Sequence, residues 1–167
     1  MPLTIRPVTQ ADVPFLWEML YHAARMSEDG SNSPEDAKHD PHLNIYVQEW
    51  GRHSDRGMIA YSTEDSQKLG AAWLRLLTED KSHYGYHDDE TPELAIAVQP
   101  EATGQGIGSA LLSALIEQVK TEVPAIVLTV RSDNPAKKLY EHFGFVTINE
   151  VTNRVGTSSS KMLLRFR

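Results

Sequence analysis

One stretch decides the fold of this chain: ELAIAVQPEATGQGIGSALLSALIEQVKTEV, residues 93–123. It begins with the short apolar run Glu93–Val98, which predicts a buried strand. Three glycines follow, at positions Gly104, Gly106 and Gly108. They lead into a segment whose apolar residues recur at three- and four-residue intervals, which predicts a helix with one buried face. The sequence therefore predicts a strand, a glycine-rich turn and a helix in succession.

Hydrophobic patterns on both sides of this stretch predict further strands and helices. Strands are expected over residues 3–7, 57–62, 69–77, 125–130, 146–149 and 161–166, and helices over residues 11–24, about 44–50 and within 132–145. A capping pair is expected to open the first helix, because Thr9 precedes Asp12 by three residues. The polar residues 27–42 and 78–91 are expected to form loops, the first of them mobile.

The composition is that of one globular domain over residues 1–167. Hydrophobic residues make up 40% and charged residues 23%, and no signal segment or long apolar run is apparent. The chain is therefore expected to be neither exported nor membrane-bound. A formal charge of −7 argues against nucleic-acid binding. The absence of cysteine excludes thiolate nucleophiles and cysteine-ligated zinc, and it favours a cytoplasmic protein.

The glycine-rich turn is a candidate anion-binding site. Glycines at the start of a helix leave backbone N–H groups accessible, and the helix dipole adds partial positive charge there. A Walker A site is disfavoured, because Ser109 and not lysine follows Gly108. A dinucleotide-binding turn is disfavoured by the spacing of the glycines. A tight turn that merely serves close packing stays open as an alternative.

A second segment, SDNPAKKLYEHFGF at residues 132–145, joins the first in a resemblance to a known family. Together the two segments resemble the Gcn5-related N-acetyltransferase superfamily. Members carry the pattern Q/R-x-x-G-x-G/A, and Thr103, Gly106 and Gly108 occupy its defining positions. Thr103 departs from the usual arginine or glutamine, which affects one contact to the coenzyme A diphosphate. The opening TIRPVTQADVPFLWEML is also similar to the first strand and helix of the family.

The resemblance implies an α/β fold with a mixed, mostly antiparallel sheet flanked by helices. The strands Glu93–Val98 and Ala125–Val130 would run parallel and splay apart, and acetyl-CoA would enter between them. The implied cofactor-binding residues are Ile96, Ala97, Val98, Thr103, Gly104, Gln105, Gly106, Ile107, Gly108, Ser109, Asn134 and Lys137. The backbone of residues 96–98 would pair with the pantetheine arm as an added strand does.

The resemblance also implies two catalytic residues. Tyr140 would protonate the departing coenzyme A thiolate, whereas helical periodicity alone favours a core aromatic residue at this position. Glu93 would remove the proton of the amine, commonly through water, with a solvated strand end as the alternative. The acids Asp88, Asp89 and Glu90 could contribute to the same step.

The expected reaction is direct acetyl transfer from acetyl-CoA to a primary amine of a small molecule or peptide. Two alternatives stay open: a non-catalytic acyl-CoA sensor, and an acyltransferase that uses another acyl chain or an alcohol. Acceptor specificity is expected from residues 25–56 and 78–91. The family often pairs through sheet edges or helices, which allows a homodimer. No metal is expected, since the histidine pairs at positions 39 and 42 and at positions 83 and 87 lie in polar loops.

Overall fold

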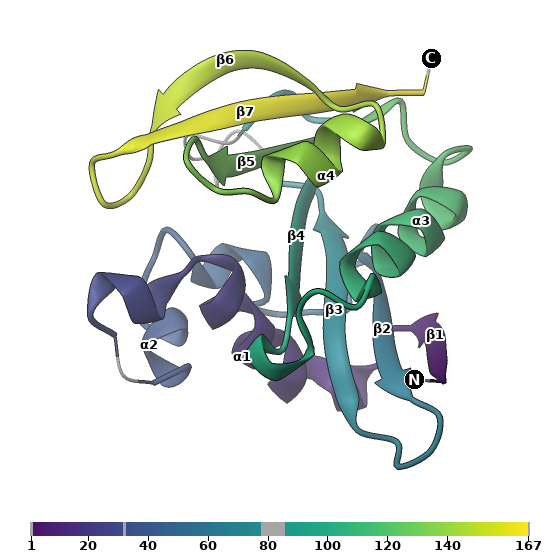
Figure 1. Cartoon of the computed structure of the whole chain (residues 1–167). Coiled ribbons are helices and arrows are strands. Elements are labelled where there is room, and N and C mark those ends of the chain that lie inside the picture. Colours follow the sequence, from purple (N-terminus) through teal and green to yellow (C-terminus); the bar gives the residue numbers. More distant parts are fainter. Residues whose placement is uncertain (1, 32, 78–85, 167) are drawn as a thin grey trace. The chain divides into compact units, whose positions relative to one another are not determined.

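The computed structural model describes residues 2–31, 33–77 and 86–166 (Figure 1). Its strands are β1 (Leu3–Pro7), β2 (Arg56–Ser62), β3 (Lys68–Arg75), β4 (Glu93–Val98), β5 (Ala125–Arg131), β6 (Val146–Thr152) and β7 (Ser158–Arg165). The α-helices are α1 (Val13–Ala23), α2 (Glu35–Lys38), α3 (Ile107–Val119) and α4 (Lys137–His142). Short 3-10 turns are η1 (Gln10–Asp12), η2 (Met26–Asp29), η3 (Asn44–Tyr46) and η5 (Pro100–Ala102).

The expected α/β class with a mixed sheet is confirmed. Across the described ranges the strands are hydrogen-bonded in the order β1-β2-β3-β4-β5-β7-β6. The pair β4–β5 is parallel, with Glu93 opposite Val127, as expected. The pairs β1–β2, β2–β3, β5–β7 and β6–β7 are antiparallel. No helix among the described residues is both long and apolar enough to cross a bilayer.

Contacts within the chain divide it into two compact units. Unit 1 comprises Met1–Arg75 and Ala95–Gln118, and unit 2 comprises Leu76–Leu94 and Val119–Arg167. The single domain expected from the composition stays a prediction.

In unit 1, strand β3 is buried along almost its whole length. Residues 69–75 are all buried. Gly70 permits a close approach of neighbouring backbone and helix. A Cβ added there would lie 2.9 Å from the carbonyl oxygen of Ala97 and 3.1 Å from Cδ1 of Leu111. Glycine at this position therefore lets β3 pack directly against β4 and α3.

Two large side chains of β3 hold the segment that precedes β2. The indole Nε1 of Trp73 donates to the carbonyl oxygen of Tyr46 at 3.0 Å. Arg75 forms a fully buried ion pair with Asp55, with Nη2 at 3.0 Å from Oδ2 and Nε at 3.1 Å from Oδ1. Its Nη1 also donates to the carbonyl oxygens of Ile45 and Gln48. A buried charge needs such complete pairing.

The start of α1 confirms the expected capping pair. The N–H of Thr9 donates to Oδ2 of Asp12 at 2.8 Å, and the N–H of Asp12 donates to the carbonyl oxygen of Thr9 at 2.9 Å. Asp12 is buried, and its carboxylate also forms ion pairs with Nη1 of Arg6 at 2.7 Å and with Nζ of Lys68 at 2.6 Å. Hydrogen bonds from Arg6 are the largest cause that lowers the pKa of Asp12 far below its usual range.

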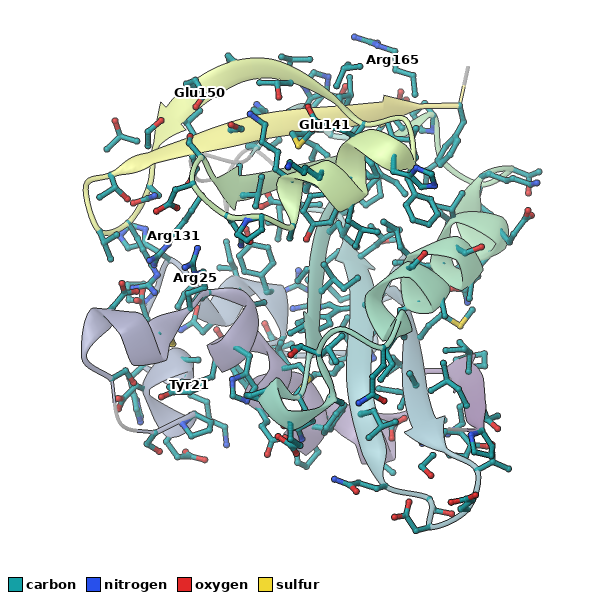
Figure 2. All side chains as sticks on the ribbon, viewed as in Figure 1. Tyr21, Arg25, Arg131, Glu141, Glu150 and Arg165 are labelled. Atoms are coloured by element: carbon teal, nitrogen blue, oxygen red, sulfur yellow. The ribbon has the colours of Figure 1, made fainter. Side chains whose placement is uncertain are left out.

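The expectation of a mobile loop over residues 27–42 is wrong in part, because this segment contains helical turns. Turn η2 overlaps the start of this segment, and helix α2 lies within it. The sequence Ser33-Pro34-Glu35 carries start signals for a helix, and Oγ of Ser33 accepts from the N–H of Glu35 at 3.2 Å. Tyr21 of α1 donates its hydroxyl to the carbonyl oxygen of Ser31 at 2.9 Å (Figure 2).

Other boundaries differ by small amounts. The helix expected over residues 44–50 is only the 3-10 turn Asn44–Tyr46, because Arg75 takes up carbonyl oxygens that a longer helix would use and Glu49 has a φ of 60°. Strand β3 ends at Arg75, two residues before its expected end. Residues 78–85 of the expected loop 78–91 lie outside the described residues.

Unit 2 is built around β5 and β7. Strand β5 is mostly buried and pairs with β7 from Ala125 opposite Arg165 to Arg131 opposite Ser159. Strand β6 pairs with the other edge of β7 and exposes nearly all of its residues. Phe145, which follows α4, is buried at 2% exposure. The core of unit 2 therefore lies under β5, β7 and the end of α4.

The buried carboxylate of Asp12 gives a first prediction, for the pH dependence of stability. The pKa of Asp12 is lower in the folded than in the unfolded state. Its ionised carboxylate therefore contributes fully to stability above the unfolded pKa of about 3.9, and this contribution is lost as the pH falls toward the folded pKa. We expect Asp12→Asn to have a lower free energy of unfolding than the wild type at pH 7. The difference between the two proteins should be smaller at pH 3. Urea denaturation at pH 7, 5 and 3 measures this.

The exposed Asp65 provides the control for that experiment. Its carboxylate accepts from the N–H of Gln67 at 3.0 Å, a bond that an asparagine side chain can also accept. Asp65→Asn should leave stability near that of the wild type at each pH. A gap between the wild type and Asp12→Asn that stayed constant from pH 7 to pH 3 would contradict the ion-pair argument.

Candidate functional site

The glycine-rich turn of unit 1 has the backbone conformation that an anion cradle requires. Gly104 has a φ of 79° and Gly106 a φ of 78°, a region that side chains other than glycine rarely adopt. A Cβ built on either residue would meet no atom within 4 Å. Close packing therefore does not explain these two glycines. The turn is exposed and open to a ligand.

Helix α3 begins directly after this turn and runs for 13 residues. The N–H of Ala110 donates to the carbonyl oxygen of Gly106 at 3.1 Å. Ile107, Gly108 and Ser109 therefore occupy the first turn of the helix, where backbone N–H groups have no intrahelical acceptor. Ile107 is buried and anchors the turn, whereas Gly104, Gln105 and Gly106 are exposed. These N–H groups and the helix dipole suit a phosphate group.

The second part of β4 also belongs to unit 1. Ile96, Ala97 and Val98 are half-buried, in contrast to the buried start of the strand. Just after them, the N–H of Gln99 donates to the carbonyl oxygen of Leu69 at 2.7 Å. The side-chain amide of Gln99 donates to Glu18 of α1 at 2.6 Å. The end of β4 is therefore fixed to both β3 and α1.

Thr103 is exposed and contributes to the turn itself. Its hydroxyl donates to the carbonyl oxygen of Pro100 at 3.1 Å, which closes the 3-10 turn η5 before Gly104. An arginine or glutamine at this position could reach much further from the backbone than threonine. Thr103 therefore stabilises the turn. Its side chain is shorter than the arginine or glutamine of the family pattern, so the contact that those residues make to the diphosphate would fall to other groups.

In unit 2, Glu93 lies at the start of β4 and is buried at 3% exposure. The alternative of a solvated strand end does not apply. Lys161 of β7 lies within electrostatic range of Glu93. Burial lowers the pKa of the Lys161 amine, while the charges of Glu93 and Asp88 act in the opposite direction. The Lys161 amine also donates to the carbonyl oxygen of Tyr86.

Lys161 is not among the residues that the sequence pattern indicated. A lysine at an interior position of a β-strand was the available signal, because the rest of this strand up to Leu164 carries serine and apolar residues. Lys161 places a positive charge near the buried carboxylate of Glu93.

Tyr140 lies on α4 and is buried at 7% exposure. Its ring packs edge-to-face on Phe145, with centroids 6.0 Å apart. Burial raises the pKa of the Tyr140 hydroxyl to about 12. This hydroxyl is therefore protonated at neutral pH and can donate a hydrogen bond or a proton.

Asn134 and Lys137 occupy the segment that leads into α4. Oδ1 of Asn134 accepts from the N–H of Ala136 at 2.9 Å, so this side chain stabilises the turn around Pro135. Hydrogen bonds, first of all from Ser132, lower the pKa of Glu150, and the charge of Lys137 adds to this effect. Asn134 therefore has a structural role beside its predicted cofactor contact.

The candidate residues are thus divided between the units. Unit 1 holds Ile96 to Val98 and the turn Thr103 to Ser109, and unit 2 holds Glu93, Asn134, Lys137 and Tyr140. Within the described ranges, no group of three or more histidine, aspartate or glutamate residues could hold a metal ion. His83 of the considered histidine pairs lies outside those ranges.

The mixed sheet with the parallel pair β4–β5 and the glycine-rich turn at the start of α3 are features that the resemblance to the acetyl-CoA-dependent transferases implies. A profile of the Acetyltransferase (GNAT) domain matches residues 63–166, which includes both segments of the resemblance. The chain therefore belongs to the GNAT family, the Gcn5-related N-acetyltransferases. It is an enzyme of the acetyltransferase class.

Solved structures agree on the fold. The putative acetyltransferase yncA from Salmonella typhimurium, with acetyl-CoA, aligns with a TM-score of 0.72 and 21% identity over 100% of this chain and 95% of its own. Spermidine N-acetyltransferase from Vibrio cholerae, in complex with CoA and spermine, aligns with a TM-score of 0.67 and 21% identity over 98% and 95%. A dodecameric structure of the same enzyme aligns with a TM-score of 0.66 and 18% identity, over 98% of this chain and 94% of its own. No curated protein sequence matches the chain.

The open turn gives a second prediction, for coenzyme A binding. Gly106→Ala places a Cβ in the open space before the helix N-terminus, where it would keep a diphosphate from the backbone N–H groups. We expect the affinity for coenzyme A to fall about 10-fold or more. Isothermal titration calorimetry with free coenzyme A measures it.

Gly156 offers a matched control in unit 2. Its φ is 86°, and an added Cβ would likewise meet no atom within 4 Å. Gly156→Ala should therefore cost about the same stability as Gly106→Ala, on the order of 1 kcal/mol for a left-handed alanine. Coenzyme A affinity should stay at the wild-type value in this variant. An equal loss of affinity in both variants would contradict a cradle at Gly106.

Proposed function

We propose that this chain transfers an acetyl group from acetyl-CoA to a primary amine of a small molecule or peptide. The observation that carries the proposal is the pair of left-handed glycines, Gly104 and Gly106, in an open turn at the N-terminus of α3. Membership of the GNAT family supports it. Since the chain has no cysteine to carry an acyl group, the transfer is direct, within a ternary complex.

The cofactor-binding residues act through their backbone. N–H groups of residues 104–109 bind the diphosphate, and the dipole of α3 adds to the attraction. The backbone of Ile96, Ala97 and Val98 binds the pantetheine arm by strand-like hydrogen bonds, and one N–H of this strand polarises the thioester carbonyl. The side chain of Ala97 leaves room for this approach. Asn134 and Lys137 complete the binding residues.

The chemistry needs three proton movements. An ammonium group loses one proton to become a nucleophile, the nitrogen loses another after it has bonded to the thioester carbon, and the departing sulfur gains one. Glu93, directly or through water, accepts the first proton of the amine, and the second leaves to solvent. The bond between carbon and sulfur breaks, and Tyr140 donates its proton to the departing thiolate. Solvent then restores the proton of Tyr140, and the products are an acetamide and a free thiol.

Burial of Tyr140 affects how it acts. A hydroxyl with a pKa of about 12 is a weaker acid than a thiol, whose pKa is about 8.5. Tyr140 therefore first stabilises the developing thiolate by a hydrogen bond, and its proton passes to the sulfur as solvent replaces it on the hydroxyl. Because this hydroxyl stays protonated well above neutral pH, it sets no alkaline limit on the rate near neutral pH.

The acceptor is an amine of cationic character. The chain carries a net charge of −7, which attracts cations over long range. The solved spermidine N-acetyltransferase with bound spermine supports polyamines as one class to be tested, next to amino acids and peptides. A cytoplasmic setting accords with the lack of cysteine. Self-association is also part of the proposal, with the dodecamer of the Vibrio cholerae enzyme as a precedent for assembly in this fold.

The proposed role of Tyr140 gives a third prediction. We expect Tyr140→Phe to bind acetyl-CoA with wild-type affinity and to lower kcat by about 10²- to 10⁴-fold, because only the donor hydroxyl is lost. Thiol release, followed with a thiol reagent against a panel of amines, polyamines, amino acids and peptides, measures kcat. Calorimetry with acetyl-CoA, coenzyme A and NADH measures affinity and selectivity.

Tyr61→Phe is the control for the loss of a tyrosine hydroxyl. Tyr61 is a half-buried residue of β2 and lies under the guanidinium of Arg6. Its phenylalanine variant should keep kcat. Wild-type turnover in Tyr140→Phe would exclude Tyr140 as the proton donor. Selective coenzyme A binding without turnover on any amine would instead leave the chain a sensor.

A further inference from the structure

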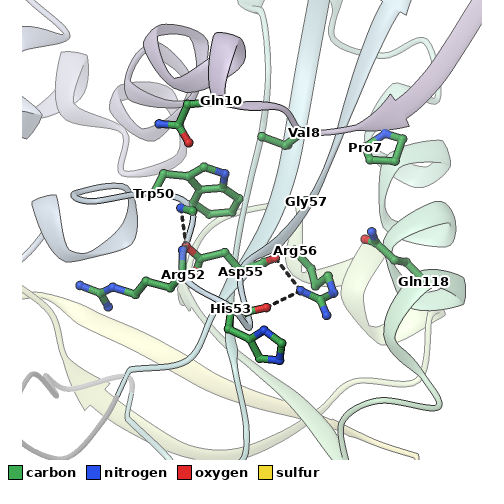
Figure 3. A pocket seen from close by; sticks show the side chains of 11 residues that line it. Pro7, Val8, Gln10, Trp50, Arg52, His53, Asp55, Arg56, Gly57 and Gln118 are labelled. Carbon is green, nitrogen blue, oxygen red and sulfur yellow. Dashed lines mark hydrogen bonds between the residues drawn. The ribbon is translucent and has the colours of Figure 1, made fainter.

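A cavity of about 350 Å³ lies in unit 1, and none of its lining residues takes part in the proposed transfer (Figure 3). Its walls come from the chain between the end of β1 and η1, from the segment 50–57 and from the last turn of α3. The glycine-rich turn lies at the other end of α3, about 18 Å away along the helix axis. The volume falls within the range of small-molecule sites. Binding in this cavity does not depend on the proposed function.

The charged side chains of the cavity wall are already engaged. The carboxylate of Asp55 pairs with the buried Arg75 and accepts from two backbone N–H groups, at 3.0 and 2.9 Å. Arg52 points away from the cavity and pairs with Glu49 at 3.6 Å (Figure 3). Nη1 of Arg56 donates to two backbone carbonyl oxygens, both at 2.9 Å. Recognition of a ligand therefore falls to the uncharged groups of the wall.

Trp50 is the largest uncharged group of the wall. Its indole lines the cavity, and the guanidinium carbon of Arg75 lies over the ring, 5.6 Å from its centre. Arg75 is fully buried and does not line the cavity, so this cation lies on the protein side of the ring. A cation draws the π electrons of an indole toward itself. The face toward the cavity is therefore better suited to stack on an electron-rich flat ring than on a saturated one.

Gln118, in the last turn of α3, presents its amide to the cavity (Figure 3). Its Oε1 is buried and has no hydrogen-bond partner among the described residues. The terminal torsion of a glutamine has no sharp rotamer, so the amide plane can turn and bring both its oxygen and its nitrogen to a ligand. A primary amide offers an acceptor beside a donor. This pair matches the amino group and the adjacent ring nitrogen of an aminopurine, which glutamine binds in a bidentate manner.

We propose that this cavity binds an uncharged aminopurine base, the class to which adenine belongs. The indole of Trp50 stacks on the ring. Oε1 of Gln118 accepts from the exocyclic amino group, and Nε2 donates to the neighbouring ring nitrogen. Such a base carries both the electron-rich ring and the donor–acceptor edge that these two side chains require. Because adenine is neutral, the charge of −7 on the chain neither attracts nor repels it over long range.

Calorimetric titration of the full chain with adenine tests the proposal. Indole lacks the amino group and the acceptor nitrogen, glucose lacks a flat ring, and benzoate adds a negative charge. We expect saturable binding of adenine, about 10-fold weaker binding of indole, and no saturable binding of glucose or benzoate. The proposal is overturned if adenine does not bind, or if any of the other three binds as tightly as adenine.

Coenzyme A itself carries an adenine base, so the titration is repeated with the chain saturated with coenzyme A. The cavity and the glycine-rich turn lie at opposite ends of α3, and the affinity for adenine should therefore stay the same. Displacement of adenine by coenzyme A would place the base in the proposed cofactor site and overturn the assignment to this cavity. Binding of adenine by a chain that binds no coenzyme A would support this cavity and contradict the proposed function alone.

Two variants place the base in the cavity. Trp50→Leu should weaken the binding of adenine and of indole alike, by about 10-fold. Gln118→Leu should reduce the affinity for adenine to that for indole and leave indole binding unchanged. Trp17→Leu is the matched control, because Trp17 is also a half-buried residue of unit 1 with a cation 5.7 Å from its ring centre, yet it does not line the cavity. Equal losses in Trp50→Leu and Trp17→Leu would overturn the assignment to this cavity.

The wild-type chain allows a test that does not depend on the folding of Trp50→Leu. Its three tryptophans, Trp17, Trp50 and Trp73, give three indole N–H resonances in a ¹⁵N-correlated NMR spectrum, which phenylalanine variants assign. A purine stacked on Trp50 should shift the resonance of this indole in a saturable manner through its ring current, and leave the other two nearly unchanged. A shift confined to Trp17 or Trp73 would contradict the proposal.

Discussion

The burial of β3 is the constraint on which unit 1 depends. A strand whose residues 69–75 are all inaccessible must satisfy every polar group that it carries. Gly70 allows β4 and α3 to pack against its backbone, and the indole of Trp73 donates to the carbonyl oxygen of Tyr46. Arg75 pairs with Asp55 and donates to two carbonyl oxygens. Breaking any of these contacts would leave a void or an unpaired polar group. The same strand thus supports the glycine-rich turn and holds the segment that precedes β2.

The local parts of the fold could be predicted from the sequence because their determinants are close in sequence. Strand β4 has the expected bounds, since a short apolar run followed by glycines leaves little choice. The first helix begins at the Thr9–Asp12 pair for the same reason. The left-handed glycines of the turn also follow from local sterics. These features explain why two short segments were enough to indicate the family.

The contacts that complete the structure could not be predicted, since they join residues far apart in sequence. Arg75 and Asp55 are 20 residues apart, and no periodicity relates them. The charges of Lys161 and Glu93 interact across the intervening strand β5, so a lysine in β7 indicated nothing about an acid in β4. The burial of Glu93 is likewise a tertiary effect. The helical turns within residues 27–42 were missed because their polar composition outweighed the Ser33-Pro34 start signal.

The positions of the tryptophans have a spectroscopic consequence. All three, Trp17, Trp50 and Trp73, belong to unit 1, and unit 2 contains none. Trp73 is inaccessible to solvent, so its emission should shift to longer wavelength when β3 becomes exposed. Fluorescence excited selectively at tryptophan therefore reports on unit 1 alone, whereas far-ultraviolet circular dichroism reports on the whole chain. Coincidence of the two unfolding curves distinguishes one cooperative domain from two units that melt separately.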